Sequence, residues 1–379
     1  MKQPPPKGRG AADNPANRFE RIVVEAAEVD ESLIIGENPD IAESGDELGT
    51  GAGVAAALNR GGRVATELLR DTSRSLITRN DSPGVGFSVS LNPYRGCEHG
   101  CIYCYARPSH AFLGLSPGLD FESRIFYKPQ AAALLKQELS KKGYTCRPIA
   151  LGSNTDPYQP AERKLGITRS ILEVLRDYRH PVTIVTKGAL IQRDIDILAE
   201  MAERRLACVT VSVTTLDRAL ARVMEPRAAT PQRRIETIAA LAKAGIPTGV
   251  LSAPMIPALN DAEMEDILAA AKDAGAVTAG YTMLRLPLEL KALFKEWLEA
   301  HVPNKTSHVL SLVAQSHGGK LYDSTWSKRM VGYGPYADML SMRFDKACRR
   351  LGLDRRHTEP LDISLFRMPA RAGDQLALF

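Results

Sequence analysis

Three cysteines lie close together in the segment Asn92-Pro-Tyr-Arg-Gly-Cys97-Glu-His-Gly-Cys101-Ile-Tyr-Cys104-Tyr105. Thiolates at this spacing can surround one metal centre, and iron–sulfur clusters normally take four cysteine ligands. Because only three cysteines are close, one iron of such a cluster would keep an open position for another ligand. An open position is typical of a catalytic metal, whereas a structural centre is closed. The spacing therefore predicts a catalytic iron–sulfur cluster.

A zinc site built from the same three cysteines and His99 is the alternative. A structural zinc site does not explain the strand–helix units that follow the cysteines. It also does not explain the aromatic Tyr103 directly before the last cysteine. We therefore favour the iron–sulfur cluster.

The elements that must position this loop extend from about residue 76 to 303. There, short β-type runs alternate with helix-type runs, a pattern typical of a parallel sheet with crossover helices. The predicted strands are 86–91, 147–153, 182–187, 207–214, 246–253 and 277–283. The cysteine segment follows the first strand, and barrel enzymes place their chemistry at the carboxyl ends of strands.

The fourth predicted strand, 207–214, alternates small polar residues with valines. A period of two places the valines against the helices and the polar side chains in a barrel interior. Helix starts agree with this arrangement. Thr230-Pro231 predicts a capped helix start, and Asn260 with Glu263 predicts a capping box.

Three further segments flank the predicted barrel. Residues 1–75 contain Pro- and Gly-rich and acidic stretches, which indicate a partly disordered N-terminal extension with one short helix at 64–70. Residues 304–371 form a C-terminal capping segment in which aromatic residues alternate with Lys and Arg. Residues 372–379 form a flexible tail.

The C-x3-C-x2-C spacing with an aromatic residue before the final cysteine resembles the radical S-adenosylmethionine (SAM) superfamily, over roughly residues 76–303. The resemblance implies an α/β fold, a partial (β/α)6 TIM-like barrel. It implies a [4Fe–4S] cluster on Cys97, Cys101 and Cys104, whose fourth iron binds SAM. The reduced cluster would cleave SAM to a 5′-deoxyadenosyl radical that abstracts hydrogen from a substrate. An electron donor such as flavodoxin or ferredoxin is implied as well.

Further segments resemble the spore photoproduct lyase-like group, often described as DNA repair photolyases. These segments are Gly152-Ser-Asn-Thr-Asp156-Pro-Tyr-Gln-Pro, Val185-Thr-Lys187, Ser212, Met224-Glu-Pro226 with Arg234, and Ala253-Pro254. Each lies at the carboxyl end of a predicted strand or just beyond it. By this resemblance the SAM site contains Tyr103, Asp156, Lys187, Ser212, Glu225 and Arg234.

The resemblance gives three of these residues a specific role. Tyr103 would contact the adenine side of SAM, Lys187 would bring positive charge near its carboxylate, and Ser212 would offer a hydroxyl group. Two alternatives stay open. Ser212 could simply fill the barrel interior, and Glu225 could be a surface carboxylate beside a helix.

One departure concerns the hydrogen donor of the lyase. The spore lyase carries a cysteine at the end of its second strand, whereas residues 151–156 of this chain contain no thiol. Cys146 and Cys208 lie at the amino ends of predicted strands, where structural thiols are expected. The resemblance therefore does not extend to the lyase reaction. The opening Gly8-Arg-Gly-Ala11 resembles uncharacterised bacterial members of the group.

The substrate stays open between several classes. DNA repair or base modification is favoured, because of the lyase-like resemblance and the aromatic and basic residues of 318–350. Modification of RNA, a peptide or a small molecule is the first alternative. A non-catalytic iron–sulfur protein that binds nucleic acid is the second.

The tail suggests a partner at sites of DNA replication. Its sequence Gln-Leu-x-Leu-Phe resembles the peptide by which bacterial polymerases and repair proteins bind the sliding clamp. The expected contacts are Gln375, Leu376, Leu378 and Phe379.

The composition excludes few of these functional classes. The net charge of +5 is too small to identify a nucleic-acid partner by itself. The sequence has no run of 18 apolar residues and its start lacks the apolar stretch of a signal peptide, so we expect a cytoplasmic protein without a membrane partner.

Overall fold

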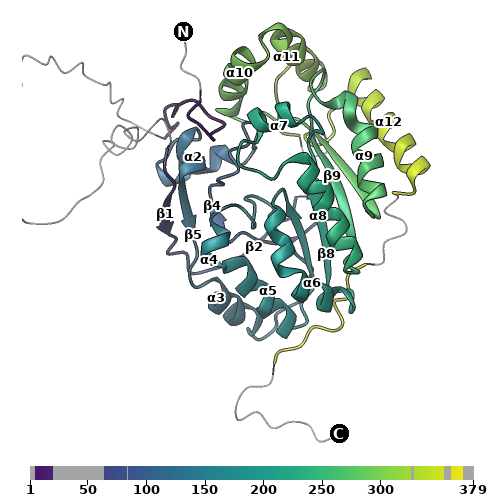
Figure 1. Cartoon of the computed structure of the whole chain (residues 1–379). Helices are drawn as coiled ribbons and strands as arrows, with labels where there is room; N and C mark the ends of the chain where they lie inside the picture. The colour runs from purple at the N-terminus through teal and green to yellow at the C-terminus, as the bar shows by residue number, and fades with distance from the viewer. Residues whose placement is uncertain (1–4, 20–63, 83, 326–327, 354–359, 370–379) are drawn as a thin grey trace, which may run out of the picture.

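A seven-stranded sheet forms the centre of the computed structural model (Figure 1). The structure describes residues 5–19, 64–82, 84–325, 328–353 and 360–369. In spatial order the strands are β10 (Thr278–Met283), β9 (Thr248–Met255), β8 (Ala207–Ser212), β7 (Val182–Thr186), β6 (Ile149–Leu151), β3 (Val89–Leu91) and β2 (Ile77–Arg79).

The strands from β10 to β3 run parallel, and β2 pairs antiparallel with β3. These parallel strands confirm the six predicted ones. Within the described residues the edge strands β10 and β2 do not pair with each other. The sheet is therefore open, as expected for a partial barrel.

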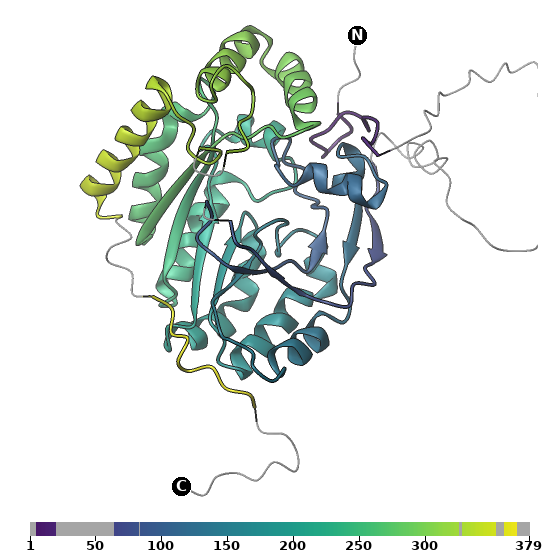
Figure 2. The same ribbon diagram turned by 180° about the vertical axis from the view of Figure 1, so that it is seen from behind.

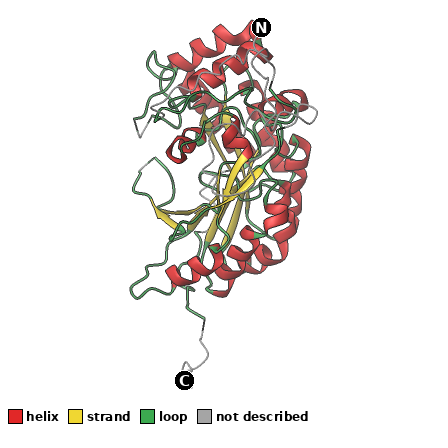
Figure 3. Ribbon diagram, turned by 90° about the vertical axis from the view of Figure 1, so that its left-hand side faces the viewer, coloured by secondary structure: helices red, strands yellow, loops and turns green. Residues whose placement is uncertain are grey.

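Helices cover one face of this sheet (Figure 3). Those between the parallel strands are α3 (Ala131–Leu139), α4 (Glu162–Leu165), α5 (Ile167–Asp177), η3 (Ala189–Asp194), α6 (Ile195–Ala202), α7 (Arg218–Met224), α8 (Pro231–Lys243), η4 (Asp261–Glu263) and α9 (Met264–Asp273). Thr230 caps α8 by accepting a hydrogen bond from the Arg233 amide, as predicted. The capping box predicted at Asn260 is absent, because the Asn260 side chain makes no cap hydrogen bond.

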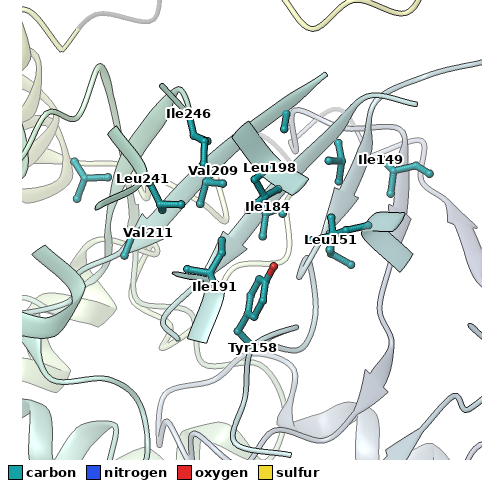
Figure 4. Close-up of a cluster of buried hydrophobic side chains, with 14 of the residues drawn as sticks. Ile149, Leu151, Tyr158, Ile184, Ile191, Leu198, Val209, Val211, Leu241 and Ile246 are labelled. Atoms are coloured by element: carbon teal, nitrogen blue, oxygen red, sulfur yellow. The ribbon is translucent and has the colours of Figure 1, made fainter. Parts of the chain in front are cut away.

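The side chains of β8 alternate as the sequence predicts. Val209 and Val211 are buried and pack with Ile184 and Leu241 in the layer between sheet and helices (Figure 4). Thr210, on the opposite face, is only partly buried. The apolar face thus holds the helices, and the polar face is left for the barrel interior.

A second sheet of three strands lies beside the barrel. It has the order β1 (Glu67–Arg70), β5 (Arg124–Tyr127) and β4 (Tyr94–Arg95). Figure 2 shows it close to the N-terminal residues and on the opposite side of the molecule from α12 (Pro335–Leu351). The short helix predicted at 64–70 is wrong, because residues 67–70 pair with β5 as a strand.

The N-terminal residues 5–19 have specific contacts with the barrel. Arg9, Ala11 and Asn17 are buried, and the Asn17 amide group donates to the carbonyl oxygens of Ala111 and Leu115 at 3.1 and 3.2 Å. This part of the extension therefore differs from the expectation of a segment with little fixed structure. The composition of residues 5–19 did not reveal these partners, because they lie some 94 to 98 positions along the chain.

The C-terminal segment adds helices to the barrel. It is preceded by α10 (Leu290–His301), begins within η5 (Pro303–Lys305), and contains α11 (Thr306–Gln315) and α12. Helix α12 packs on α9 (Figure 1), and its Phe344 ring lies 4.7 Å from the Tyr281 ring of β10. Tyr336 donates to Asp261 at 2.5 Å. These two aromatic side chains therefore hold α12 on the barrel rather than forming an exposed basic and aromatic surface.

Residues 360–369 run along the amino ends of the strands. Phe366 contacts the rings of Tyr144, Tyr178 and His180, with centroid distances of 5.3, 6.5 and 5.5 Å. The expected clamp-binding residues Gln375, Leu376, Leu378 and Phe379 lie outside the described residues. Among the helices that the structure describes, none is long and apolar enough to cross a membrane.

Candidate active site

The loop after β3 carries the three cysteines. Cys97 and Cys101 are each 8% exposed, and Cys104 is partly buried. Two backbone turns wrap the loop, from Gly100 N–H to the Cys97 carbonyl at 3.4 Å and from Cys104 N–H to the Cys101 carbonyl at 3.2 Å. The loop therefore gathers the thiols in one buried place at the carboxyl end of β3.

Burial has the same effect on each thiol. It raises the pKa of Cys97, Cys101 and Cys104, and the negative charges of neighbouring groups raise the first two further. For Cys97 the neighbouring charges include Asp156 and the other two thiols. Cys104 packs with Cys101 in one hydrophobic cluster and with Cys97 in another, so the loop brings the three side chains together. Thiols in such a place lose their protons only when a cation binds them.

The geometry argues against the zinc alternative and fits a larger cluster. His99 does not join the thiols, because its Nδ1 lies 3.3 Å from Asp156 Oδ2. Within the described ranges, no three His, Cys, Asp or Glu side chains are spaced to hold a single metal ion. In an iron–sulfur cluster each cysteine binds a different iron, so its thiolates stand farther apart than the ligands of one ion. Three soft donors in one loop, with Cys97 and Cys101 buried and Cys104 partly buried, fit such a cluster.

Polar residues from two strands meet next to the cysteine loop. Lys187 follows the end of β7, and its Nζ donates to Oγ of Ser212, the last residue of β8, at 2.5 Å. The same Nζ lies 3.7 Å from Glu225 Oε1 and 5.8 Å from the centre of the Tyr103 ring. A charged side chain here needs such partners, because burial lowers the pKa of Lys187.

Glu225 lies at the centre of this polar group. It is 3% exposed and accepts hydrogen bonds from Tyr103, from Thr214 at 2.6 Å and from Arg234. The interpretation of Glu225 as a surface carboxylate is therefore wrong. Arg234 is also buried, and it donates further to the carbonyl oxygens of Ala229 and Ser212.

Asp156 connects the loop after β6 to the other loops. Its Oδ1 accepts from the Tyr158 amide at 2.8 Å and from the Thr186 hydroxyl at 2.7 Å. Its Oδ2 accepts from the Lys187 amide at 2.7 Å and faces His99. Burial alone would raise the pKa of Asp156, but His99 and these hydrogen bonds hold it at about 2. Asp156 is thus a charged residue whose oxygen atoms already have protein partners.

The loop from Gly152 to Asp156 is fixed against the cysteine loop. Asn92 accepts from the Asn154 amide at 2.9 Å and donates to the Ser153 hydroxyl at 3.2 Å. Tyr105 donates to the Ser153 carbonyl oxygen. The end of β6 and the loop after it therefore offer a serine hydroxyl and backbone groups, and residues 151–156 contain no thiol.

Sequence analysis missed a second buried charge group, under the cysteine loop. Arg107 and Glu122 are both fully buried and paired with each other, and Arg107 donates to the carbonyl oxygens of Gly100 and Cys101. Glu122 also accepts from the amides of Gly10 and Ala11 at 2.9 Å each. The only signal in the sequence was the Gly8-Arg-Gly-Ala11 segment, whose partners it could not indicate.

Gly10 touches the cysteine loop itself. A Cβ atom at Gly10 would lie 1.9 Å from the carbonyl oxygen of Gly100, closer than any real contact allows. Gly100 has a φ of +68°, and a Cβ there would lie 2.7 Å from Glu122. The N-terminal residues therefore lie directly on the loop between Cys97 and Cys101.

Two of the three other cysteines, Cys146 and Cys208, are expected at the amino ends of strands, and Cys348 belongs to α12. Cys208 pairs in register with Thr183 near the amino end of β8, and Cys146 precedes β6. Both are partly buried, and burial raises the pKa of each to about 11. They agree with the expected position at the amino ends of the strands.

Comparison of sequences supports the interpretation of the cysteine loop. The chain matches the Radical SAM superfamily over residues 91–271. The uncharacterized protein Rv2578c of Mycobacterium tuberculosis is 36% identical over 228 residues, which cover 60% of this chain and 67% of that protein. The uncharacterized protein MJ0683 of Methanocaldococcus jannaschii is 27% identical over 237 residues, or 62% of this chain and 84% of that protein.

Comparison of structures supports the fold. A mutant of spore photoproduct lyase superposes with a TM-score of 0.51 and 14% identity, over 76% of this chain and 80% of the lyase. A second mutant of the same lyase gives a TM-score of 0.50 and 15% identity, over 75% and 78%. With its family match, its relatives and this fold, the chain belongs to the radical SAM superfamily, and it is an enzyme whose cofactors are a [4Fe–4S] cluster and SAM.

Proposed function

We propose that this enzyme modifies or repairs DNA by reductive SAM cleavage, with Cys97, Cys101 and Cys104 as the ligands of the cluster. The observation that carries the proposal is the contact of Tyr103, in the cysteine loop, with Lys187 and Glu225 beside the buried thiols of Cys97 and Cys101. When bound and reduced, the cluster supplies the electron that breaks the C5′–S bond of SAM. The protein's part is to bind SAM, orient it and exclude water.

Three residues are the best candidates for direct contact with SAM. Lys187 offers a positive charge for the carboxylate, since its ammonium group has room for one more acceptor besides Ser212 and Glu225. The Ser212 hydroxyl and the Tyr103 ring lie beside it. All three come from loops or strand ends around the thiols, which agrees with the roles that the resemblance implies.

Asp156, Glu225 and Arg234 are better explained as positioning residues. Both oxygen atoms of Asp156 are used by neighbouring loops, and Arg234 is bonded to Glu225 and to two carbonyl oxygens. Glu225 in turn holds Tyr103 and lies within ion-pair distance of Lys187. Through these bonds they fix the residues that contact SAM.

DNA is the proposed substrate class for two reasons. The fold is shared with spore photoproduct lyase, and the tail sequence resembles a clamp-binding peptide. Because Ser153 and its neighbours supply no thiol, hydrogen would return to the product from another donor, or the product would keep a modified base.

The test is anaerobic reconstitution with iron, sulfide, dithionite and SAM, followed by measurement of 5′-deoxyadenosine. We expect DNA to stimulate its formation, and RNA or free nucleotides to have little effect. Stimulation by RNA alone would move the substrate to RNA. An intact cluster that never cleaves SAM would support the non-catalytic alternative. Cys101→Ala is the matched control for background cleavage.

We propose in addition that the tail binds the replication sliding clamp. Gln375 offers amide hydrogen bonds, and Leu376, Leu378 and Phe379 offer apolar anchors for a groove. A segment that orders on binding loses affinity to entropy, so we expect binding in the micromolar range. A peptide of residues 370–379 should bind the bacterial clamp, and the same peptide with Gln375→Ala or Leu378→Ala should not. Equal binding of all three peptides, or none, would contradict this.

A further inference from the structure

Three aromatic rings of the described residues are exposed to solvent. They are Phe19, Tyr105 and Phe112, with exposed fractions of 54%, 44% and 73%. The other large hydrophobic side chains that are exposed in the described ranges are Leu, Val, Ile or Met. Aromatic rings left in water have a cost, and their presence points to a partner that covers them.

Each of these rings lies under an arginine. The guanidinium carbon of Arg18 lies 4.7 Å from the centre of the Phe19 ring and 5.1 Å from that of Phe112. The two rings are 5.3 Å apart, centre to centre. Arg285 lies 4.2 Å from the centre of the Tyr105 ring. Aromatic rings combined with arginine are the side chains that stack on bases of single-stranded nucleic acid.

The Phe19–Phe112 pair is held in place by the barrel. Arg18 donates to the Pro108 carbonyl oxygen at 3.2 Å and to the two oxygen atoms of Glu289 at 2.8 and 3.1 Å. Arg18 is thus fixed over both rings, and its own charge is compensated by Glu289. The pair forms a rigid surface that can bind without first losing side-chain freedom.

The same loop links this pair to the active site. Arg285 and Glu289 both belong to the segment between β10 and α10, at the carboxyl end of the sheet. Phe112 lies in η2 (Arg107–Leu113), which follows Cys104 after two residues. Tyr105 is adjacent to Cys104 and bonded to Ser153. The exposed rings therefore lie around the cysteine loop, on the side of the barrel where substrate must enter.

We propose that Phe19 and Phe112 form a stacking platform for an unpaired base of a DNA substrate. Arg285, which lies over the Tyr105 ring, would neutralise the backbone phosphate between this platform and the active site. An unpaired base is required because the faces of paired bases are covered inside a duplex. Enzymes that act on a base commonly take it out of the stack. This proposal rests on DNA being the substrate.

The experiment measures binding of fluorescent oligonucleotides to the full-length protein. The probes are a single-stranded DNA, the same DNA as a complete duplex, a duplex with an unpaired bubble, and the matching single-stranded RNA. We expect the single strand and the bubble to bind more tightly than the complete duplex. Phe112→Ala and Phe19→Ala should each weaken this binding roughly tenfold, or about 1.4 kcal/mol.

Two further variants sharpen the result. Met342→Ala removes a side chain that is 65% exposed on α12, far along the chain from the cysteine loop, and should leave the dissociation constant unchanged. Arg285→Gln should weaken binding of every DNA probe and reduce the salt dependence by about one released ion. Thermal melting of the aromatic variants should stay close to that of the unchanged protein, because both rings are exposed.

The outcomes separate this inference from the proposed function. If the unchanged protein binds DNA and both aromatic variants bind it equally well, or if the complete duplex binds best, the platform is wrong while the DNA substrate stands. If the protein binds only RNA, or no nucleic acid, both proposals fall. If Phe112→Ala slows reduction of the cluster by flavodoxin without changing DNA binding, the rings serve an electron donor instead.

Discussion

The carboxyl and amino ends of the parallel strands differ in the buried charged groups that they hold. At the carboxyl ends, Lys187, Glu225 and Arg234 are charged groups that compensate one another within hydrogen-bond or ion-pair distance. At the amino ends, burial keeps such groups neutral. It lowers the pKa of His180 to about 4 and raises that of Cys208 to about 11.

The difference shows that this fold buries charged groups at the carboxyl ends of its parallel strands. His180 needs only a hydrogen bond with Tyr144 at 2.8 Å and contact with Phe366. Glu225 needs two cations and two hydroxyl groups to be buried at all. Buried ion pairs contribute little net stability, so this group at the carboxyl ends indicates a requirement of function. Substitutions at the carboxyl ends should therefore change chemistry, and substitutions at the amino ends should not.

The largest effect is expected from the cysteines themselves. Replacing Cys97, Cys101 or Cys104 with Ala should abolish the iron–sulfur absorbance at about 400 nm and SAM cleavage together, because the cluster supplies the chemistry. Far-ultraviolet circular dichroism should be unchanged. Optical spectra, iron content and 5′-deoxyadenosine formation check the prediction. SAM cleavage retained in any one variant would contradict the ligand assignment.

Glu225→Gln should cause the largest loss of stability. Without its charge, Arg234 and Lys187 stay in a buried place with no anion, and breaking such a pair costs about 3–5 kcal/mol. Urea unfolding of the protein without cofactors measures this. Glu173→Gln is the matched control, since its pair with Arg169 is exposed and should contribute less than about 1 kcal/mol. Equal losses in both variants would show that burial is not the cause.

Lys187→Ala should weaken SAM binding and leave the cluster in place. Loss of a charged hydrogen bond to a carboxylate costs about 1.5–3 kcal/mol, which is roughly tenfold or more in affinity. Equilibrium binding of SAM to the reconstituted protein gives the dissociation constant. Lys187→Arg keeps the charge and should lose less. An unchanged dissociation constant in Lys187→Ala would assign Lys187 to the fold or to the substrate.

Gly10→Val tests the contact between the N-terminal residues and the cysteine loop. The added side chain would overlap the Gly100 carbonyl oxygen, so residues 8–11 must leave the loop. We expect cluster retention in air to fall severalfold, and the thiols of the protein without iron to react faster with an alkylating agent. Ala12→Val, at an exposed position two residues away, should behave as the unchanged protein. Equal thiol reactivity in both variants would show that the contact does not protect the loop.

Much of the fold could be predicted because the sequence patterns of its strands and helix starts involve residues close together in the chain. The alternating valines of β8 and the cap at Thr230 depend on neighbours within a few residues, and both are confirmed. The capping box at Asn260 failed for the opposite reason. Asn260 donates to the carbonyl oxygens of Thr214 and Pro254, and Glu263 accepts from Thr215 and the Leu216 amide. Both side chains therefore bond with residues outside the helix start, and they do not form the reciprocal bonds of a capping box.

The same distinction applies to the active site. The three cysteines fall within eight residues, so their spacing alone predicted the site. The pair of Arg107 and Glu122 was missed, because the Gly10 amide that Glu122 binds lies 112 residues away. No periodicity or spacing indicates such a contact. Only the folded chain brings the N-terminal residues onto the cysteine loop.

The smallest effect is expected at the amino ends of the strands. Cys208 lies four residues before Ser212 on β8, so about 13 Å of extended strand separates it from the proposed SAM site. Burial raises its pKa to about 11, as it does for Cys146, so both groups are neutral thiols near pH 7. Cys208→Ala and Cys146→Ala should therefore keep cluster content and turnover unchanged, and lose only the modest stability of a partly buried small side chain. Turnover with the best nucleic-acid substrate, at equal iron content, measures this. If either variant kept its cluster and melting temperature but lost turnover, its thiol would be returning hydrogen to the product, and the two ends of the sheet would share the chemistry after all.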